Sequence, residues 1–213
     1  HESQSSIWEI FIGQSPAFWK FYFHILQDRF PFLAKRSRDE MFKAINRVKP
    51  DFIRIDADPL TYDLHIALRV RLEVALISGD LTVADLPGAW NDGMKELLGI
   101  TPPTDTLGCL QDTHWASGNF GYFGVYTLGH LMAAQLFETM DSQWGPEQQT
   151  LTMDHRINTG NFAPILEWLR ANVHRRARSC TSSELMQEVT GQPLSPAAFL
   201  GIMTERMSQV YGL

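Results

Sequence analysis

Residues 59–78, PLTYDLHIALRVRLEVALIS, set the fold class because their apolar side chains recur at the spacing of an α-helix. Asp58 is expected to cap this helix, since a residue before proline avoids the helical region and an aspartate side chain accepts hydrogen bonds from free N–H groups. Pro59 suits the first helical position, where its missing N–H is not needed. Gly79 and Asp80 follow and predict the end of the helix.

The same helical period runs through the rest of the chain, and we find no alternating strand between turn signals. Ser15-Pro16 predicts the start of a helix that is apolar almost all round and is expected to be buried, and Ser37 begins a capping-box pattern. Further helices are expected over residues 3–13, 84–98, 121–140, 147–158, 162–174, 182–190 and 196–211. The sequence therefore predicts an all-α fold, with residues 1–213 forming a single helical unit.

Charge and composition exclude several classes of protein. The chain has 18 Lys and Arg against 24 Asp and Glu, a net charge of −6, which argues against nucleic-acid and anionic-membrane partners. It lacks the run of about 18 apolar residues that a transmembrane helix needs. The two cysteines cannot build a disulfide framework, and they fit a reducing compartment.

A polar stripe follows one face of the helix predicted at residues 59–78. Tyr62, His65, Arg69 and Glu73 are spaced so that they share this face, while most other positions are apolar. The helix is therefore expected to be largely buried, and its polar stripe is either satisfied by an internal network of hydrogen bonds and ion pairs or lines a site. Just upstream, Arg54 lies between isoleucines and could bind a carboxylate through its planar fork.

The loop GCLQDTHW, residues 108–115, has an unusual density of side chains that are common in functional sites: Gln111, Asp112, His114 and Trp115. Tyr122 and Tyr126 follow four residues apart, so in a helix they point the same way. A tyrosine hydroxyl can stabilise an oxyanion. The alternative is that the glycines allow close packing and the aromatic rings form core.

The segment HESQS at residues 1–5 has a histidine followed by a glutamate, as zinc peptidases of the HExxH type do. The second histidine of that motif is absent, because Ser5 stands at its position, and HExxH occurs nowhere in the chain. Spacing alone therefore favours a solvated or capping role for Glu2 over metal binding.

Three motifs together resemble the Taq-type thermostable metallocarboxypeptidases. His1-Glu2-Ser3-Gln4 is similar to their HES(G/Q) motif, residues 53–58 (IRIDAD) to IRxxAD, and residues 108–115 to GxxQDxHW. The motifs occur in the family's order, and the similarity covers the chain from end to end. The resemblance implies an all-helical, peptidase-type half-domain that lines a substrate cleft.

The resemblance also implies an activity, a cofactor and site residues. The family releases C-terminal amino acids from peptides with broad specificity, and its members are cytoplasmic homodimers that use a divalent metal, zinc or alternatively cobalt. Glu2 corresponds to a metal ligand. Catalytic roles are expected for His114, Tyr122 and Tyr126. Substrate-binding roles are expected for Arg54, His65, Gln111, Asp112 and Trp115.

The family's HExxH helix, which carries two metal ligands and the general base, precedes HES, whereas here nothing precedes His1. We therefore expect residues 1–213 to be the C-terminal part of a larger catalytic domain, to need an HExxH-bearing portion as partner, and to be inactive alone. Two alternatives remain open. One is a non-catalytic helical module for binding or dimerisation, and the other is a related dipeptidyl peptidase or oligopeptidase.

Overall fold

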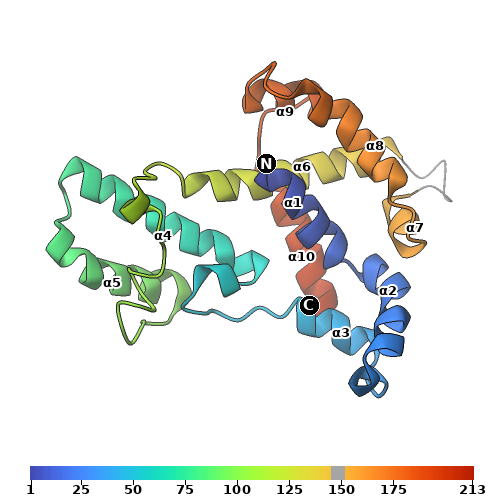
Figure 1. Ribbon diagram of the computed structural model, residues 1–213, viewed down its shortest axis with the longest axis horizontal. Coiled ribbons are helices and arrows are strands. Elements are labelled where there is room, and N and C mark those ends of the chain that lie inside the picture. Colours follow the sequence, from blue (N-terminus) through green and yellow to red (C-terminus); the bar gives the residue numbers. More distant parts are fainter. Residues whose placement is uncertain (145–151) are drawn as a thin grey trace. The chain divides into compact units, whose positions relative to one another are not determined.

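A computed structural model of the protein describes residues 1–144 and 152–213. The regular elements in this part of the chain are helices and it contains no strand, so the predicted all-α fold is confirmed (Figure 1). None of the described helices combines the length and the apolar character needed to cross a membrane. The chain divides into two compact units: residues 47–128, called here the inner unit, and residues 1–46 with 129–213, called the terminal unit. That residues 1–213 form a single unit stays a prediction.

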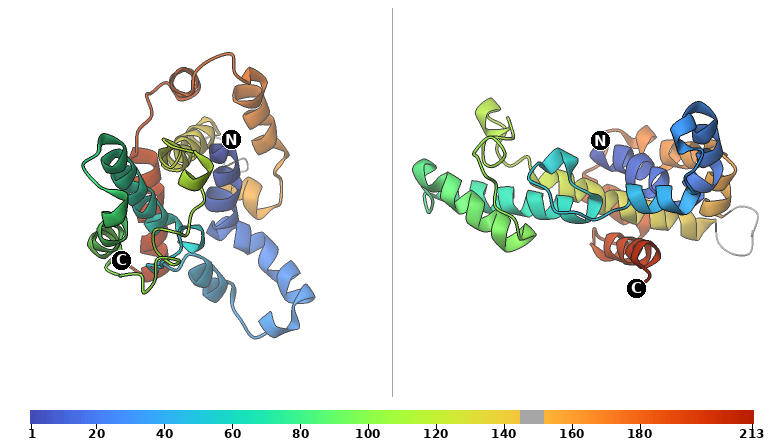
Figure 2. Two further views of the ribbon diagram at one scale, coloured as in Figure 1. Left: turned by 60° about the vertical axis from the view of Figure 1, so that its left-hand side comes forward. Right: turned by 90° about the horizontal axis from the view of Figure 1, so that it is seen from below.

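The inner unit is built on a hairpin of two helices, α4 (Pro59–Ser78) and α5 (Leu86–Leu98). The two helices lie side by side in Figures 1 and 2. Gly93 allows this close approach, because a Cβ at that position would lie 2.3 Å from Cδ1 of Leu68. The core between the helices consists of Leu68, Leu72, Trp90, Met94 and Leu98.

Helix α4 begins and ends as predicted. Oδ1 of Asp58 accepts hydrogen bonds from the N–H groups of Leu60 and Thr61, each at 3.0 Å, and Gly79 ends the helix in the left-handed conformation. The expectation that most of the helix is buried was wrong for one face. Val70, Val74 and Ile77 are exposed, because α5 and the long loop that follows it cover the opposite side.

The terminal unit holds the remaining helices, apart from the first turn of α6, around one hydrophobic core. The core includes Ile7, Phe11, Leu136, Ile165 and Met203. The helices are α1 (Glu2–Ser6), the π-helical segment η1 (Ile7–Gly13), α2 (Pro16–Arg29), α3 (Arg38–Ile45), α6 (Gly124–Gln143), α7 (Met153–Asn158), α8 (Ala163–Asn172), α9 (Ser182–Thr190) and α10 (Ala197–Tyr211). Short 3-10 turns are η2 (Pro31–Leu33) and η7 (His174–Arg176) in this unit, and η3 (Arg54–Asp56), η4 (Val83–Asp85) and η5 (Trp115–Ser117) in the inner unit.

Several sequence-based expectations about the helices need correction. The helix expected at residues 3–13 widens into η1 after Ser6, whose hydroxyl donates to the carbonyl of Glu2 at 2.8 Å, and such bonding to the preceding turn distorts helices. The helix expected from residue 121 begins at Gly124, because Gly121 has a φ of +71°. Helix α2 buries only Ala17 and Phe23 fully. Of the helix expected at residues 147–158, residues 147–151 lie outside the described part.

Candidate functional site

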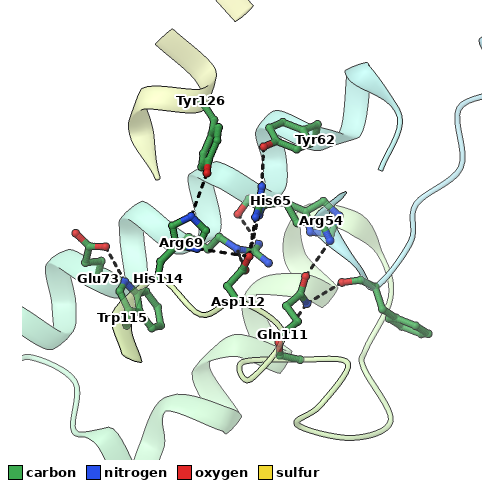
Figure 3. A network of polar contacts seen from close by, with 12 residues as sticks. Arg54, Tyr62, His65, Arg69, Glu73, Gln111, Asp112, His114, Trp115 and Tyr126 are labelled. Atoms are coloured by element: carbon green, nitrogen blue, oxygen red, sulfur yellow. Dashed lines mark hydrogen bonds and ion pairs between the residues drawn. The ribbon is translucent and has the colours of Figure 1, made fainter. Parts of the chain in front are cut away.

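A largely buried carboxylate, that of Asp112, joins two arginines of the inner unit (Figure 3). Oδ1 of Asp112 accepts from Nε and Nη2 of Arg54 at 3.0 and 2.7 Å, and Oδ2 accepts from Nε of Arg69 at 2.6 Å. Burial alone would raise the pKa of Asp112. The guanidinium of Arg69, and to a smaller extent that of Arg54, instead holds this pKa below its ordinary value. The group of three side chains therefore carries a formal charge of +1.

Arg54 lies on η3, directly before α4, and is 6% exposed. Besides Asp112 it contacts Tyr62, whose hydroxyl accepts from Nη1 at 2.7 Å. A guanidinium has five N–H groups, and these bonds engage three of them, one on each nitrogen. One N–H on each terminal nitrogen of Arg54 is therefore not used by these bonds.

Gln111 holds the loop against the segment that carries Arg54. Its Oε1 accepts from the backbone N–H of Arg54 at 2.8 Å, and its Nε2 donates to the carbonyl of Phe52 at 2.9 Å. The side-chain amide thus takes the place of backbone pairing between two irregular segments. This contact fixes the backbone of Arg54 while Asp112 fixes its side chain.

His114 lies beside both candidate tyrosines. Its Nε2 is 3.1 Å from the hydroxyl of Tyr126, and its ring centroid is 5.8 Å from that of Tyr122. Burial, then the charges of Arg54 and Arg69, lower the pKa of His114 despite the opposing effect of Asp112. A neutral imidazole at this position can exchange a hydrogen bond with a phenol in either direction. Tyr122 is 42% exposed.

The sequence did not single out two further members of this network as site residues, Arg69 and Glu73. Arg69 is fully buried and stacks on Trp90, with its Cζ 4.6 Å from the ring centroid. Glu73 is also buried and accepts from Nε1 of Trp115 at 2.7 Å and from the N–H of Gly121. The sequence signal for both residues was their place in the polar stripe of α4. Of the two alternatives given for that stripe, these side chains form the internal network of hydrogen bonds and ion pairs.

His65 is fully buried on the same stripe, and neither ring nitrogen has a hydrogen-bond partner among the described residues. Burial, and then the charges of Arg69 and Arg54, lower its pKa from 6.5 to about 4. The ring is therefore neutral at pH 7. Its backbone carbonyl accepts from Nη1 of Arg69 at 2.8 Å, which ties this turn of α4 to the arginine cluster.

We predict that the chain loses stability as the pH falls from 6.5 towards 4. In this range the unfolded chain protonates His65 and the folded chain does not, so the free energy of unfolding decreases by up to about 3 kcal/mol. Urea unfolding of the wild type and of His65→Phe at pH 7 and pH 4.5 measures this effect. The variant should lose this part of the pH dependence, and identical pH dependence in the two proteins would contradict the prediction.

Glu2 belongs to the terminal unit, where α6 packs closely against it. A Cβ at Gly129 would lie 2.9 Å from Cβ of Glu2, so a larger residue there would displace α1. The hydroxyls of Ser5 and Ser6 both donate to the carbonyl of Glu2, at 2.8 Å. Within the described residues the half-buried Glu2 carboxylate makes no hydrogen bond or ion pair, so it is available to a cation.

The described residues offer one candidate metal ligand, Glu2, and no complete metal site. No three His, Cys, Asp or Glu side chains among them are grouped so that they could hold a metal ion. A catalytic zinc needs three protein ligands and an open position. Glu2 therefore fits as one oxygen donor of a site whose other ligands are not among these groups.

Comparison with known proteins finds the same family along nearly the whole chain. The family model described as carboxypeptidase Taq (M32) metallopeptidase matches residues 1–207. Thermostable carboxypeptidase 1 of Thermus thermophilus is 39% identical over 212 residues, which are 100% of this chain and 40% of the relative. Carboxypeptidase 1 of Bacillus subtilis is 41% identical, over 99% of this chain and 41% of the relative.

A solved structure, the M32 carboxypeptidase from Deinococcus radiodurans, is 38% identical with a TM-score of 0.94, over 100% of this chain and 42% of that one. The chain thus spans about two fifths of the length of the relatives that it matches. A family match over residues 1–207, with this agreement in fold, decides the family. The chain belongs to the carboxypeptidase Taq (M32) family of metallopeptidases.

Proposed function

We propose that this chain contributes substrate-binding and metal-binding residues to a metal-dependent carboxypeptidase that releases C-terminal amino acids from peptides. The similar relatives are named carboxypeptidases, and this supports the reaction class. The observation that carries the proposal is the buried fork of Arg54, held by Asp112 and Tyr62 with two N–H groups left over. An exopeptidase must recognise a terminal carboxylate, and a fixed guanidinium does so with two parallel hydrogen bonds.

In this proposal the cluster around Arg54 binds the C-terminal carboxylate of the peptide. The excess positive charge of Arg54, Arg69 and Asp112 favours an anion, and low local dielectric strengthens that attraction. Gln111 supports Arg54 through its backbone. His65 and Trp115 complete the substrate-binding region by packing and by fixing the loop that carries Asp112.

His114, Tyr126 and Tyr122 act on the scissile bond in this proposal. The hydrogen bond between His114 and Tyr126 holds both groups in place, and preorganised donors stabilise an oxyanion better than mobile ones. Tyr122, exposed two residues before α6, supplies a second hydroxyl. The lowered pKa of His114 favours the neutral imidazole. Its ring N–H can donate a hydrogen bond without adding positive charge to the site.

Glu2 is proposed as one ligand of a zinc ion, with cobalt as an alternative. When bound, the metal supplies an activated water and polarises the scissile carbonyl. The other protein ligands and the general base belong to an HExxH helix, a motif that these 213 residues lack. We therefore propose that the 213 residues alone do not catalyse the reaction. A cytoplasmic location and a homodimeric state remain predictions from the resemblance.

Replacing Arg54 with alanine tests this proposal. The test uses a polypeptide that joins these residues to the HExxH-bearing portion of a family member, called here the joined polypeptide. Removing one partner of a buried charge pair costs about 2 kcal/mol or more, so KM for an N-blocked peptide should rise roughly 30-fold or more. Arg71→Ala is the matched control, because Arg71 is an exposed arginine of α4 that pairs with Glu96. Equal KM values for the two variants would contradict the proposed role.

A further inference from the structure

A single carboxylate closes the loop between Trp115 and Gly121. One oxygen of Glu73 accepts from Nε1 of Trp115 (Figure 3). The other accepts from the N–H of Gly121, and these two residues flank the loop. His114 immediately precedes Trp115, and Tyr122 immediately follows Gly121. We propose that Glu73 is a positioning residue that sets the separation of His114 and Tyr122; its catalytic consequence rests on the proposed function.

Besides Glu73, two kinds of contact hold this loop: backbone bonds at its beginning, and the buried ring of Phe123 just after Tyr122, which packs on the rings of His114 and Trp115 with centroids 4.4 and 5.7 Å apart. The N–H groups of Ser117 and Asn119 bond to the carbonyls of Thr113 and His114, at 2.9 and 2.8 Å, so these bonds order only its beginning. Residues 116–122 are exposed and contribute no buried side chain. Gly118 and Gly121 have φ values of +74° and +71°, conformations that glycine adopts without strain but does not enforce. The bond from Gly121 to Glu73 therefore fixes the backbone directly before Tyr122, and the packing of Phe123 fixes it directly after.

Tyr122 depends on these contacts more than its neighbours do. Its hydroxyl makes no hydrogen bond within the described residues, and its ring is 42% exposed. Tyr126, by contrast, lies inside α6 and is bonded to His114. The 5.8 Å separation of the His114 and Tyr122 rings therefore depends on the backbone on both sides of Tyr122: at Gly121, which Glu73 holds, and at Phe123, whose buried ring packs on His114.

A carboxylate suits this task because two donors converge on it. Glu73 offers two acceptor oxygens, and hydrogen bonds to a charged acceptor are stronger than neutral ones. A glutamine would present an NH2 group to one of the two N–H donors and lose that bond. Glu73 is 9% exposed and forms no ion pair among the described residues, so these two donors are what compensates for its burial.

The first test uses the 213-residue chain and needs no activity. In Glu73→Gln, the amide of Gly121 should exchange with solvent at least about 10-fold faster, which corresponds to the loss of roughly one hydrogen bond. NMR contacts between the His114 and Tyr122 rings should also weaken, while the amides of Leu68 and Leu72 stay protected. Glu96→Gln, an exposed carboxylate on α5, is the matched control. Unchanged exchange at Gly121 together with unchanged ring contacts would overturn the proposal.

The second test uses the joined polypeptide. Glu73→Gln should lower kcat about 10- to 100-fold, as is typical for removal of a supporting residue, with little change in KM, because the arginine cluster is untouched. A proportional change in KM with constant kcat, or no change at all, would overturn the catalytic part. Should Glu73→Gln fail to fold, Trp115→Phe decides, because it removes one donor and keeps an aromatic ring. The ring at position 115 should then be held less firmly and kcat should fall, and unchanged kcat would again overturn the proposal.

Discussion

Replacing Asp112 with asparagine is expected to lower the free energy of unfolding by roughly 3–5 kcal/mol, the usual cost of removing one partner from a buried ion pair. Asp112 accepts from both Arg54 and Arg69, whose side chains are 7% and 0% exposed. Asparagine keeps one acceptor oxygen but turns an NH2 group toward one guanidinium. Two buried cations then remain without a counter-charge in the cluster.

Urea unfolding followed by tryptophan fluorescence measures this loss. Glu96→Gln is the control, because it breaks an ion pair between exposed side chains, Arg71 and Glu96, and exposed pairs contribute little to stability. We expect no measurable change for this control. A loss for Asp112→Asn no greater than that of the control would show that the arginine cluster does not depend on Asp112.

Replacing Glu2 with glutamine is expected to remove bound zinc and activity from the joined polypeptide. A neutral amide is a much weaker zinc ligand than a carboxylate, and three protein ligands hold a catalytic zinc. The loss of activity should exceed the roughly 10- to 100-fold cost of removing a residue that only supports a ligand. Zinc per chain after dialysis and the rate of amino-acid release are the two readouts.

Glu9→Gln is the matched control for Glu2, because Glu9 is an exposed carboxylate one to two turns further along the same helical stretch. It should keep both metal and activity. Full zinc content and full turnover in Glu2→Gln would exclude Glu2 as a ligand. Retained zinc with lost turnover would instead assign Glu2 to the chemistry.

Local signals in the sequence predicted the helices well. The caps at Asp58 and Ser37 depend on side chains that bond within three residues, and the structure confirms both. The shift of the α6 start to Gly124 was harder to foresee. It depends on the left-handed conformation of Gly121, which a contact with Glu73, 48 residues earlier, holds in place.

The site was only partly predictable because its contacts join distant segments. The sequence singled out Arg54, Asp112 and His114 through motifs, and the structure brings all three into one network with Tyr62 and Tyr126. The bond between Arg69 and Asp112 spans 43 residues, and no spacing rule indicates it. Periodicity placed Glu73 on the right face of α4 but could not identify its two donors.

The claim that this chain contributes to a carboxypeptidase site is tested most directly by comparing a peptide acid with its amide. The joined polypeptide, loaded with zinc, is given an N-blocked dipeptide with a free C-terminal carboxylate and the same dipeptide as an amide. Loss of a charged contact of about 3 kcal/mol predicts a kcat/KM roughly 100-fold lower for the amide. Equal cleavage of acid and amide, or bound zinc with cleavage of neither, would contradict the account.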